Sequence, residues 1–326
     1  MHAIIPVAGK GTRLRPLTWS TPKPLLQVAG KPILGHIIDK LISAGIVHVT
    51  LIVGYLGDEI VKWTKKEYPD IHVDFAEQSN MDGLASAVNL AAPMTGDGVT
   101  LVVLGDTIFS ADVSHALNPQ RNMIAVKRVD DPSRFGVVLL EDGRIVRLIE
   151  KPEEFISNLA IVGIYGFSSG TVLMDATSKL IKSGKQTKGE YQLTDAMQLM
   201  LDEGHDFGVF EVDEWLDCGK PETFLETNRT LLDSGSGERR AEIKDSIIIP
   251  PVSLPEGTVI SSSIVGPYVS IGSDSRVENS IISNTVIGKR SAIDHVNITD
   301  SIIGDDAVVS GKAEKLNVGN SSTIEL

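Results

Sequence analysis

The chain has 326 residues, of which 42% are hydrophobic and 22% charged, with a formal net charge of −13 at pH 7. This length and composition exclude a disordered chain and predict two globular domains. The acidic balance argues against nucleic acid and anionic membranes as partners, because both attract lysine and arginine. With the single cysteine Cys218, no cationic leader and no apolar run of about 18 residues, we expect a cytoplasmic protein without a disulfide or a membrane span.

The first hundred residues alternate short β-rich runs with helical patterns, which is typical of a mainly parallel sheet covered by helices. Apolar pairs recur at helical spacing after Ile33, and Pro69 and Pro93 end the next two helices. The last strand of this part ends at Gly105-Asp106. In chain order we expect strands at 3–8, 47–53, 71–75 and 99–104, and helices at 33–45, 57–68 and 83–92.

Beyond Asp106 the pattern is mixed, and Ser234-Gly235-Ser236-Gly237 then forms a clear linker. Residues 1–234 therefore predict an α/β catalytic domain with a Rossmann-like, mainly parallel mixed sheet. Pro221 suits the first turn of the last helix. The expected strands lie at 123–129, 136–140, 144–149 and 159–167, and the expected helices at 172–183, 193–203 and 221–232.

After the linker, short Ile and Val runs separated by Ser, Asn, Asp and Gly indicate an internal repeat of five or six residues. This spacing resembles that of hexapeptide-repeat proteins, which implies a left-handed β-helix over residues 235–326. A β-sandwich is the alternative. Two series carry the repeat: Ser246-Ile247-Ile248, Ser263-Ile264-Val265, Ser280-Ile281-Ile282 and Ser301-Ile302-Ile303 in the first, and Ile271-Gly272, Ile287-Gly288 and Ile303-Gly304 in the second.

A glycine loop follows the first strand, where the backbone amides of Gly9, Gly11 and Thr12 can surround an anion. Leu14 stands where the dinucleotide fingerprint requires a third glycine, and the Walker spacing is also missing. The loop is nevertheless accompanied by Arg13, Arg15 and Lys23, a concentrated positive charge in an acidic chain. These residues predict a polyphosphate ligand.

The run Gly9-Lys10-Gly11-Thr12-Arg13-Leu14-Arg15-Pro16-Leu17-Thr18, followed by Pro22-Lys23-Pro24-Leu25-Leu26, resembles the signature of sugar-phosphate nucleotidyltransferases. The resemblance extends over about the first 230 residues, and the repeat tail is common among the longer glucose-1-phosphate thymidylyltransferases and mannose-1-phosphate guanylyltransferases. Further matching positions are Gln78, Gly83-Leu84-Ala85, Gly105-Asp106, Phe135-Gly136-Val137, Glu150-Lys151-Pro152, Gly189-Glu190, Thr194-Asp195 and Trp215-Leu216-Asp217.

The resemblance implies that an oxygen of a sugar 1-phosphate attacks the α-phosphorus of a nucleoside triphosphate and releases pyrophosphate, with Mg²⁺ as cofactor. The attacking phosphate is already anionic, so no protein nucleophile is needed. The enzyme must instead hold two repelling anions in line and neutralise the charge that moves to the leaving group. A nucleoside triphosphate and a sugar 1-phosphate are therefore the expected partners.

The same resemblance implies a role for each matching residue. The expected catalytic residues are Arg13 at the departing phosphates, Lys23 at the α-phosphate and Lys151 at the sugar phosphate. Asp106 and Asp217 would share the magnesium ion. Nucleotide-binding residues would be Ala8, Gly9, Gly11, Thr12, Gln78, Gly83 and Asp106, and sugar-binding residues Gly136, Glu150, Asn158 and Glu190.

The choice of substrates rests on fewer residues. The amide of Gln78 can donate to and accept from the paired positions on thymine or uracil. Gly83-Leu84-Ala85 and the closing segment 318–326 resemble the longer thymidylyltransferases, so dTTP with glucose 1-phosphate is the first expectation. UTP with glucose 1-phosphate and GTP with mannose 1-phosphate are the alternatives. Thr107 departs from the Asn that often follows the metal-binding Asp in short thymidylyltransferases, which leaves the sugar open.

Two functions of other classes remain as alternatives to this enzyme. Some members of the superfamily are regulatory subunits, although they lose the charged centre that this sequence keeps. Some bifunctional relatives carry an acyltransferase site on the repeat domain, but this tail offers one histidine, His295. Assembly is the expected function of the tail, because exposed coil faces need a cover, and we expect a homo-oligomer formed through the C-terminal domain.

Overall fold

A computed structural model describes residues 1–311, and the closing segment 318–326 lies outside the described residues. The chain divides into two compact units. Unit 1 comprises Met1–Leu26 and Lys31–Thr227, and unit 2 comprises Gln27–Gly30 and the chain from Asn228 onward. Because Asn228 lies within helix α6 (Pro221–Asp233), these compact units do not follow the linker, and the boundary between residues 234 and 235 stays a prediction.

Unit 1 is built on a mixed sheet of nine strands, within the described residues. The main order is β10-β9-β11-β6-β1-β4-β5, in which β6, β1, β4 and β5 are parallel and β11 is antiparallel to β6. This confirms the expected Rossmann-like sheet. The strands are β1 (His2–Pro6), β4 (His48–Val53), β5 (His72–Glu77), β6 (Thr100–Val103), β8 (Asn122–Arg128), β9 (Gly136–Glu141), β10 (Arg144–Glu150), β11 (Leu159–Phe167) and β12 (Phe207–Glu211).

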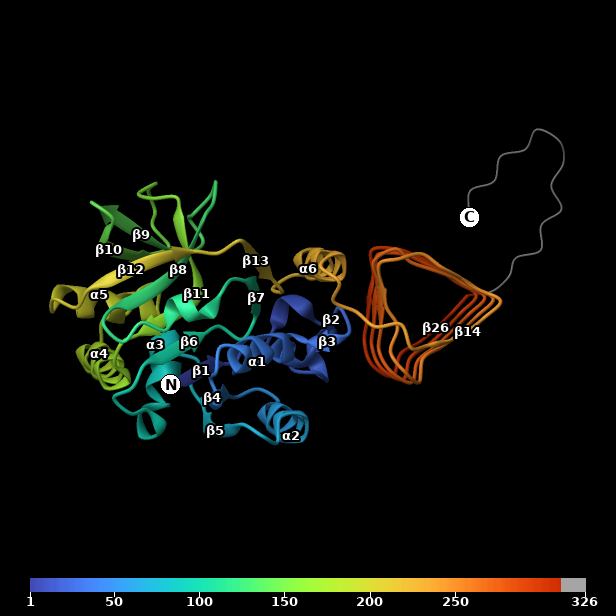
Figure 1. The fold of residues 1–326 in the computed structure, drawn as a ribbon, viewed down its shortest axis with the longest axis horizontal. Coiled ribbons are helices and arrows are strands. Elements are labelled where there is room, and N and C mark those ends of the chain that lie inside the picture. Colours follow the sequence, from blue (N-terminus) through green and yellow to red (C-terminus); the bar gives the residue numbers. More distant parts are fainter. Residues whose placement is uncertain (312–326) are drawn as a thin grey trace. The chain divides into compact units, whose positions relative to one another are not determined.

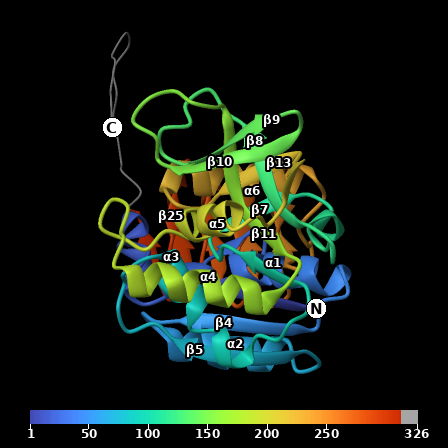
Figure 2. The ribbon, with the colours of Figure 1, turned by 90° about the vertical axis from the view of Figure 1, so that its left-hand side faces the viewer.

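Helices cover both faces of this sheet (Figures 1 and 2). On one face α3, α4 and α5 pack over a core that includes Ile4, Ile52 and Val102, and on the other face lie α1 and α2 (Figure 1). In residues 1–311, every helix is too short or too polar to cross a membrane. The helices are α1 (Ile33–Ser43), α2 (Gly57–Glu67), α3 (Leu84–Asn89), α4 (Gly170–Ser183) and α5 (Leu193–Asp202).

The carboxyl ends of β1 and β6 come close together because Gly105 follows β6. A Cβ atom at this position would lie 2.4 Å from Cγ1 of Val7 and 2.7 Å from the carbonyl oxygen of Pro6. Beyond Gly105 a small antiparallel sheet forms, in which β7 (Thr107–Ser110) pairs with β13 (Glu214–Asp217). The sequence patterns did not predict β7 or β12, nor that β13 pairs with a strand about a hundred residues earlier.

Unit 2 contains three parallel sheets that stack in the arrangement of the left-handed β-helix expected from the repeat, and the β-sandwich is excluded. Figure 1 shows the coils from one end, where they outline a triangle. The sheets are β14-β17-β20-β23-β26, β15-β18-β21-β24 and β16-β19-β22-β25. Their strands are Glu242–Lys244, Val259–Ser261, Arg276–Glu278, Ala292–Asp294 and Val308–Ser310 in the first sheet, Ile247–Ile248, Ile264–Val265, Ile281–Ile282 and Asn297–Ile298 in the second, and Val252–Ser253, Val269–Ile271, Val286–Ile287 and Ile302–Ile303 in the third.

The repeated serines stack at one corner of the β-helix. The hydroxyl of Ser246 accepts a hydrogen bond from the amide of Ser263 (3.0 Å), and that of Ser263 accepts one from the amide of Ser280 (3.0 Å). The expected fourth member, Ser301-Ile302-Ile303, was wrong. Ile302–Ile303 pairs with Val286–Ile287 on another face, because Ser301 follows Ser280 by 21 residues, whereas the coil from Ile281 to Asn297 is 16 residues long.

A buried asparagine joins three segments inside unit 2. Oδ1 of Asn228 accepts hydrogen bonds from the amide of Ala29 (2.9 Å) and from the hydroxyl of Ser270 (2.7 Å). Its Nδ2 donates to the carbonyl oxygen of Tyr268 (3.2 Å). Since Asn228 is fully buried, these bonds satisfy an amide that would otherwise be costly to remove from water. The turn at Ala29 and Gly30, between β2 (Gln27–Val28) and β3 (Lys31–Pro32), is thereby held to the coil that contains Ser270.

Candidate active site

A cleft of about 200 Å³ opens in unit 1 where β1 and β6 end. Parallel strands place their carboxyl ends at the same edge of a sheet, and ligands of open α/β sheets bind at this edge. The expected nucleotide loop lies here. Ala8 belongs to the same loop, where its carbonyl oxygen accepts a hydrogen bond from the amide of Tyr55 (3.3 Å). The cleft is lined by Pro6, Val7, Gly9, Gly11, Thr12, Arg13, Lys23, Pro24, Gly105 and Asp106.

The two loop glycines have different structural roles. A Cβ atom at Gly9 would meet no other described residue within 4 Å, so this position leaves space for a ligand. Gly11 has a left-handed φ of 59°, and a Cβ there would lie 3.0 Å from side-chain atoms of both Thr18 and Lys23. The hydroxyl of Thr18 donates to the carbonyl oxygen of Gly11 (2.9 Å). Gly11 therefore allows Lys23 to pack directly against the loop.

Lys23 and Asp106 form an ion pair in this cleft. Nζ of Lys23 donates to Oδ2 of Asp106 at 2.8 Å, and the Lys23 side chain is 9% exposed, against 43% for Asp106. A cation this deeply buried needs a charged partner, because the desolvation penalty is otherwise large. Since the Asp106 carboxylate still faces solvent, its other oxygen remains open to a ligand, with Thr107 Oγ1 only 3.4 Å away.

Asp217 lies close to Arg13, which lines this cleft, and to the neighbour of Asp106. In the β7–β13 sheet, Asp217 is the register partner of Thr107, the neighbour of Asp106. A Cβ at Gly219 would lie 2.8 Å from Oδ1 of Asp217 and 3.0 Å from Nη2 of Arg13, so glycine is needed where these two charges approach. The structure thus brings Arg13, Lys23, Asp106 and Asp217 together from four separate segments.

Cys218 lies among the charges of Lys23, Asp106 and Asp217, but its thiol is unreactive. Its side chain is fully buried, and burial raises the pKa of the thiol to about 12, opposed in part by the positive charge of Lys23. Its backbone amide donates to the carbonyl oxygen of Asp106 (3.3 Å). A protonated thiol is a poor nucleophile, so Cys218 is a packing residue between the two aspartates.

A second group of expected residues gathers at the start of β9. The hydroxyl of Thr194 donates to Oε2 of Glu150 (2.8 Å), and Nζ of Lys151 lies 3.5 Å from Oε1 of Glu150. A Cβ at Gly136 would lie 2.9 Å from Oε2 of Glu150 and 3.0 Å from Oγ1 of Thr194. Gly136 therefore leaves the space that the Glu150 carboxylate occupies.

A third group joins the expected base-binding and sugar-binding loops. Nε2 of Gln78 donates to the carbonyl oxygen of Gly83 in a long hydrogen bond of 3.5 Å. A Cβ at Gly83 would lie 2.4 Å from the carbonyl oxygen of Tyr191, whose backbone is therefore in direct contact with this turn. One residue earlier, Oε2 of Glu190 accepts from Nε2 of Gln192 (2.9 Å).

Asn158, an expected sugar-binding residue, makes its hydrogen bonds with Arg128 and Val129 and not with the residues around Glu150. Its Oδ1 accepts a hydrogen bond from Nη1 of Arg128 (3.3 Å), and its carbonyl oxygen accepts one from the amide of Val129 (3.0 Å). These bonds tie Asn158 to the end of β8 rather than to the carboxylate of Glu150. Its expected place along the sugar stays a prediction.

The two aspartates provide the donors that magnesium prefers. Carboxylate oxygens from Asp106 and Asp217 are hard ligands, and phosphate oxygens of a nucleotide are of the same kind. Asp106 has one oxygen paired with Lys23 and the other turned to the cleft, and the Asp217 carboxylate borders Gly219. The donor atoms of these two residues fit a divalent ion such as Mg²⁺.

Several residues that shape the site were not among the expected site residues. Thr194 positions Glu150, Gly219 makes room for Asp217 and Arg13, and Tyr191 contacts Gly83 through its backbone. Glycines at the ends of strands are the available sequence signal for such close contacts. Spacing in the chain does not show which side chain lies opposite each glycine.

Comparison with known proteins agrees with this geometry. The family model described as "Nucleotidyl transferase" matches residues 2–234. A low-salt glycan biosynthesis nucleotidyltransferase of Haloferax volcanii is 32% identical over the full length of both chains. A bifunctional GlmU protein of Methanocaldococcus jannaschii is 36% identical and covers 94% of this chain and 78% of its own. A glucose-1-phosphate thymidylyltransferase of Streptomyces antibioticus is 31% identical and covers 100% of this chain and 99% of its own.

A solved structure is also similar to this chain. It is described as a glucose-1-phosphate thymidylyltransferase from Bacillus anthracis in complex with sucrose, and it is 29% identical with a TM-score of 0.61. The match covers 71% of this chain and 95% of the solved one.

The raised pKa of Cys218 predicts low thiol reactivity in the folded protein. At about pH 8 an ordinary cysteine reacts readily with a disulfide reagent, whereas a thiol with a pKa of about 12 stays protonated. We expect almost no reaction of native protein with dithiobis(nitrobenzoate), and release of one thiol per chain after unfolding in guanidinium. Fast reaction of the native protein, with a rate near that of the unfolded chain, would contradict the burial of Cys218.

Proposed function

This chain belongs to the nucleotidyl transferase family, and we propose that it joins dTTP to glucose 1-phosphate, giving dTDP-glucose and pyrophosphate. The observation that carries the proposal is the convergence of Arg13, Lys23, Asp106 and Asp217 around one cleft. The full-length similarity to a glucose-1-phosphate thymidylyltransferase supports these two substrates. A sugar-phosphate nucleotidyltransferase needs such a centre, because both of its substrates are phosphorylated.

Different residues of the cleft would bind different phosphates of the nucleoside triphosphate. The open space at Gly9 and the turn at Gly11 would admit the triphosphate close to the backbone amides. Arg13 would neutralise the β- and γ-phosphates that leave, and Lys23 would contact the α-phosphate. A unit-charge pair at about 4 Å contributes roughly 4 kcal/mol at an effective dielectric constant near 20, so two cations can lower the barrier substantially.

Asp106 and Asp217 would hold one magnesium ion, which would supply charge neutralisation at the phosphate oxygens. The ion pair with Lys23 would meanwhile hold Asp106 in a fixed orientation before substrate arrives. Thr107 would support the second oxygen of Asp106.

Lys151 would hold the attacking sugar phosphate from the other side of the cleft. Its charge is paired only loosely with Glu150, at 3.5 Å, so it can turn to a phosphate at little cost. The Glu150 carboxylate, fixed by Thr194, would accept hydrogen bonds from sugar hydroxyls beside Gly136. Glu190 and Asn158 would complete the contacts with the sugar.

Gln78, together with Gly83, would form hydrogen bonds with the base of the nucleotide and so select it. The side chain of Gln78 is buried, and the weak bond to Gly83 leaves its amide able to exchange partners. An amide beside a backbone turn can pair with the donor and acceptor edge shared by thymine and uracil. UTP with glucose 1-phosphate is therefore the second candidate, and GTP with mannose 1-phosphate is the third.

A panel of triphosphates and sugar phosphates tests this proposal. Pyrophosphate release would be measured with Mg²⁺ for dTTP, UTP, GTP, ATP and CTP, each against glucose, mannose, galactose and N-acetylglucosamine 1-phosphates. We expect the largest kcat/KM with dTTP and glucose 1-phosphate and the next with UTP, because both pyrimidines offer Gln78 the same edge. A preference for a purine triphosphate would overturn the assignment of the base.

The substitution Asp217→Asn tests the metal role. An amide oxygen is a weaker ligand than a carboxylate, so we expect kcat at saturating substrates to fall by about 100-fold, with partial recovery at higher Mg²⁺. The matched control is Asp175→Asn on the exposed face of α4, which should retain full activity. Equal activity of the Asp217 variant at every Mg²⁺ concentration would remove Asp217 from the metal site.

We also propose that unit 2 assembles copies of the chain. Ile247, Ile264 and Ile281 are register partners on successive strands of one face, and Ile247 and Ile281 are 60% and 48% exposed. A flat aliphatic row of this kind favours contact with the same row of a second copy. The repeat would then serve assembly rather than catalysis.

A double substitution tests assembly without shortening the chain. Ile247→Lys with Ile281→Lys places charges in the row, so we expect a smaller sedimentation mass and unchanged secondary structure. The control is Val308→Lys, which replaces an exposed residue (78%) of another face and should leave the mass unchanged. An unchanged mass in the double variant would exclude this row as the interface.

A further inference from the structure

Three histidines form a row across neighbouring parallel strands of unit 1. Ala3 of β1 is the register partner of Val49 in β4, and His48 of β4 is the partner of His72 in β5. His2, His48 and His72 therefore stand side by side near the amino ends of these strands. The ring of His48 stacks on that of His2 at 4.3 Å and meets the edge of the His72 ring at 4.6 Å.

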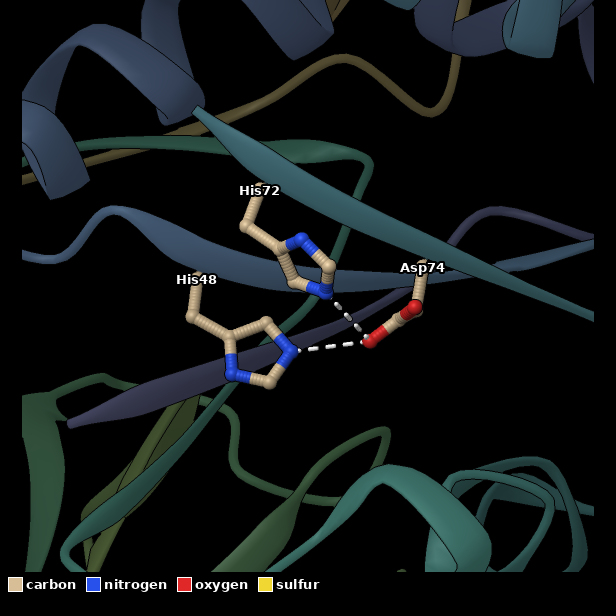
Figure 3. Close-up of side chains that lie close together, drawn as sticks. All are labelled: His48, His72 and Asp74. Carbon is tan, nitrogen blue, oxygen red and sulfur yellow. Dashed lines mark hydrogen bonds and ion pairs between the residues drawn. The ribbon is translucent and has the colours of Figure 1, made fainter. Parts of the chain in front are cut away.

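Asp74 joins two of these histidines through one oxygen atom. Because side chains alternate along a strand, Asp74 lies on the same face as His72. Its Oδ2 accepts hydrogen bonds from Nε2 of His48 at 2.8 Å and from Nε2 of His72 at 3.3 Å, and both nitrogens point at this oxygen (Figure 3). The hydrogen bond from His48 holds the pKa of Asp74 below its ordinary value, so the carboxylate is ionised at neutral pH.

We propose that His48, His72 and Asp74 bind a transition-metal ion, with Zn²⁺ as the physiological candidate. The three ligand atoms lie within 4.8 Å of one another. Ligand atoms of a tetrahedral zinc site are about 3.3 Å apart, given bond lengths of about 2.0 to 2.1 Å. The separations of Asp74 Oδ2 from Nε2 of His48 and of His72, 2.8 and 3.3 Å, need little adjustment, and water would complete the coordination at this partly exposed position.

The neighbouring histidine supports the site without binding the ion. His2 is 7% exposed, its Nε2 lies 2.7 Å from Oγ1 of Thr50, and burial lowers its pKa to about 4. The imidazole of His2 is stacked on that of His48 and fixes the plane of the His48 ring. A prearranged ligand loses less entropy when the metal binds.

This site differs from the reaction centre in place and in chemistry. It lies at the amino ends of β4 and β5, whereas the phosphate cleft lies beyond the carboxyl end of β1, at least about 13 Å away along a strand that rises roughly 3.3 Å per residue. Two imidazoles and one carboxylate favour Zn²⁺, Ni²⁺ or Cu²⁺, and the two aspartates of the cleft favour Mg²⁺. The two ions would therefore not compete.

A bound ion would cross-link the edge of the main sheet. β5 is the terminal strand in the order β6-β1-β4-β5, so one of its sides has no partner strand among the described residues. Metal bonds from His48 to His72 and Asp74 would tie β5 to β4 at the ends where both strands begin. Binding to the folded chain alone stabilises it by mass action.

Zinc titration of the tag-free full-length chain, after removal of metal with a chelator, tests the proposal. We expect one Zn²⁺ per chain with micromolar or tighter affinity in the presence of excess Mg²⁺, and a higher melting temperature with Zn²⁺. His72→Gln should weaken binding by about tenfold or more and abolish the rise in melting temperature. Because His72 is exposed, this variant should fold, and Asp74→Asn gives a second measurement with the same expected loss.

Two control variants separate this site from other places that could hold zinc. His295→Gln removes another exposed histidine paired with an aspartate, Asp294, at 2.7 Å, and should bind Zn²⁺ as the unchanged chain does. Asp217→Asn alters the magnesium site and should also keep the zinc ion. Absence of zinc binding by the unchanged chain, or equal affinity in the His72 and Asp74 variants, would overturn the proposal.

Discussion

The ion pair between Lys23 and Asp106 is the contact around which the active site is built. It joins the loop after β1 to the end of β6 at 2.8 Å, and a lysine this deeply buried is stable only beside a negative charge. The same pair fixes one carboxylate oxygen and leaves the other toward the cleft. Asp217 and Arg13 then approach each other from β13 and the glycine loop, so four charged side chains are already close together in the folded chain.

Glycines make this concentration of charge sterically possible. Gly105 allows β6 to end against Pro6, Gly219 leaves room for Asp217 beside Arg13, and Gly136 leaves room for the Glu150 carboxylate. At each position a Cβ atom would come within about 3 Å of a neighbouring atom, which packed proteins do not tolerate without movement. The chain thus places its smallest residues where backbone and functional side chains must meet, and a displacement of about 1 Å there would cost catalysis.

Much of the fold was predictable because its signals are local. Helical spacing and prolines predicted the ends of α1 and α2 to within one or two residues. The β-rich run at 159–167 predicted β11 with its observed bounds. Signals that depend on distant partners failed. The pairing of β7 with β13 was not predicted, and the series at Ser301 was misassigned because Ser301 follows Ser280 by 21 residues, whereas the coil there is 16 residues long. The side chain of Asn158 accepts a hydrogen bond from Arg128, a contact that no spacing in the sequence reveals.

The sequence by itself determined the class of reaction, since the glycine loop, its cations and the later motifs are contiguous or ordered along the chain. It also determined the repeat, because stacked coils require a regular apolar period. Only the tertiary structure decided which charges face one another, that Cys218 is buried among them with a raised pKa, and that His48, His72 and Asp74 converge. Those features depend on strand register, and register is set by packing between segments that are distant in sequence.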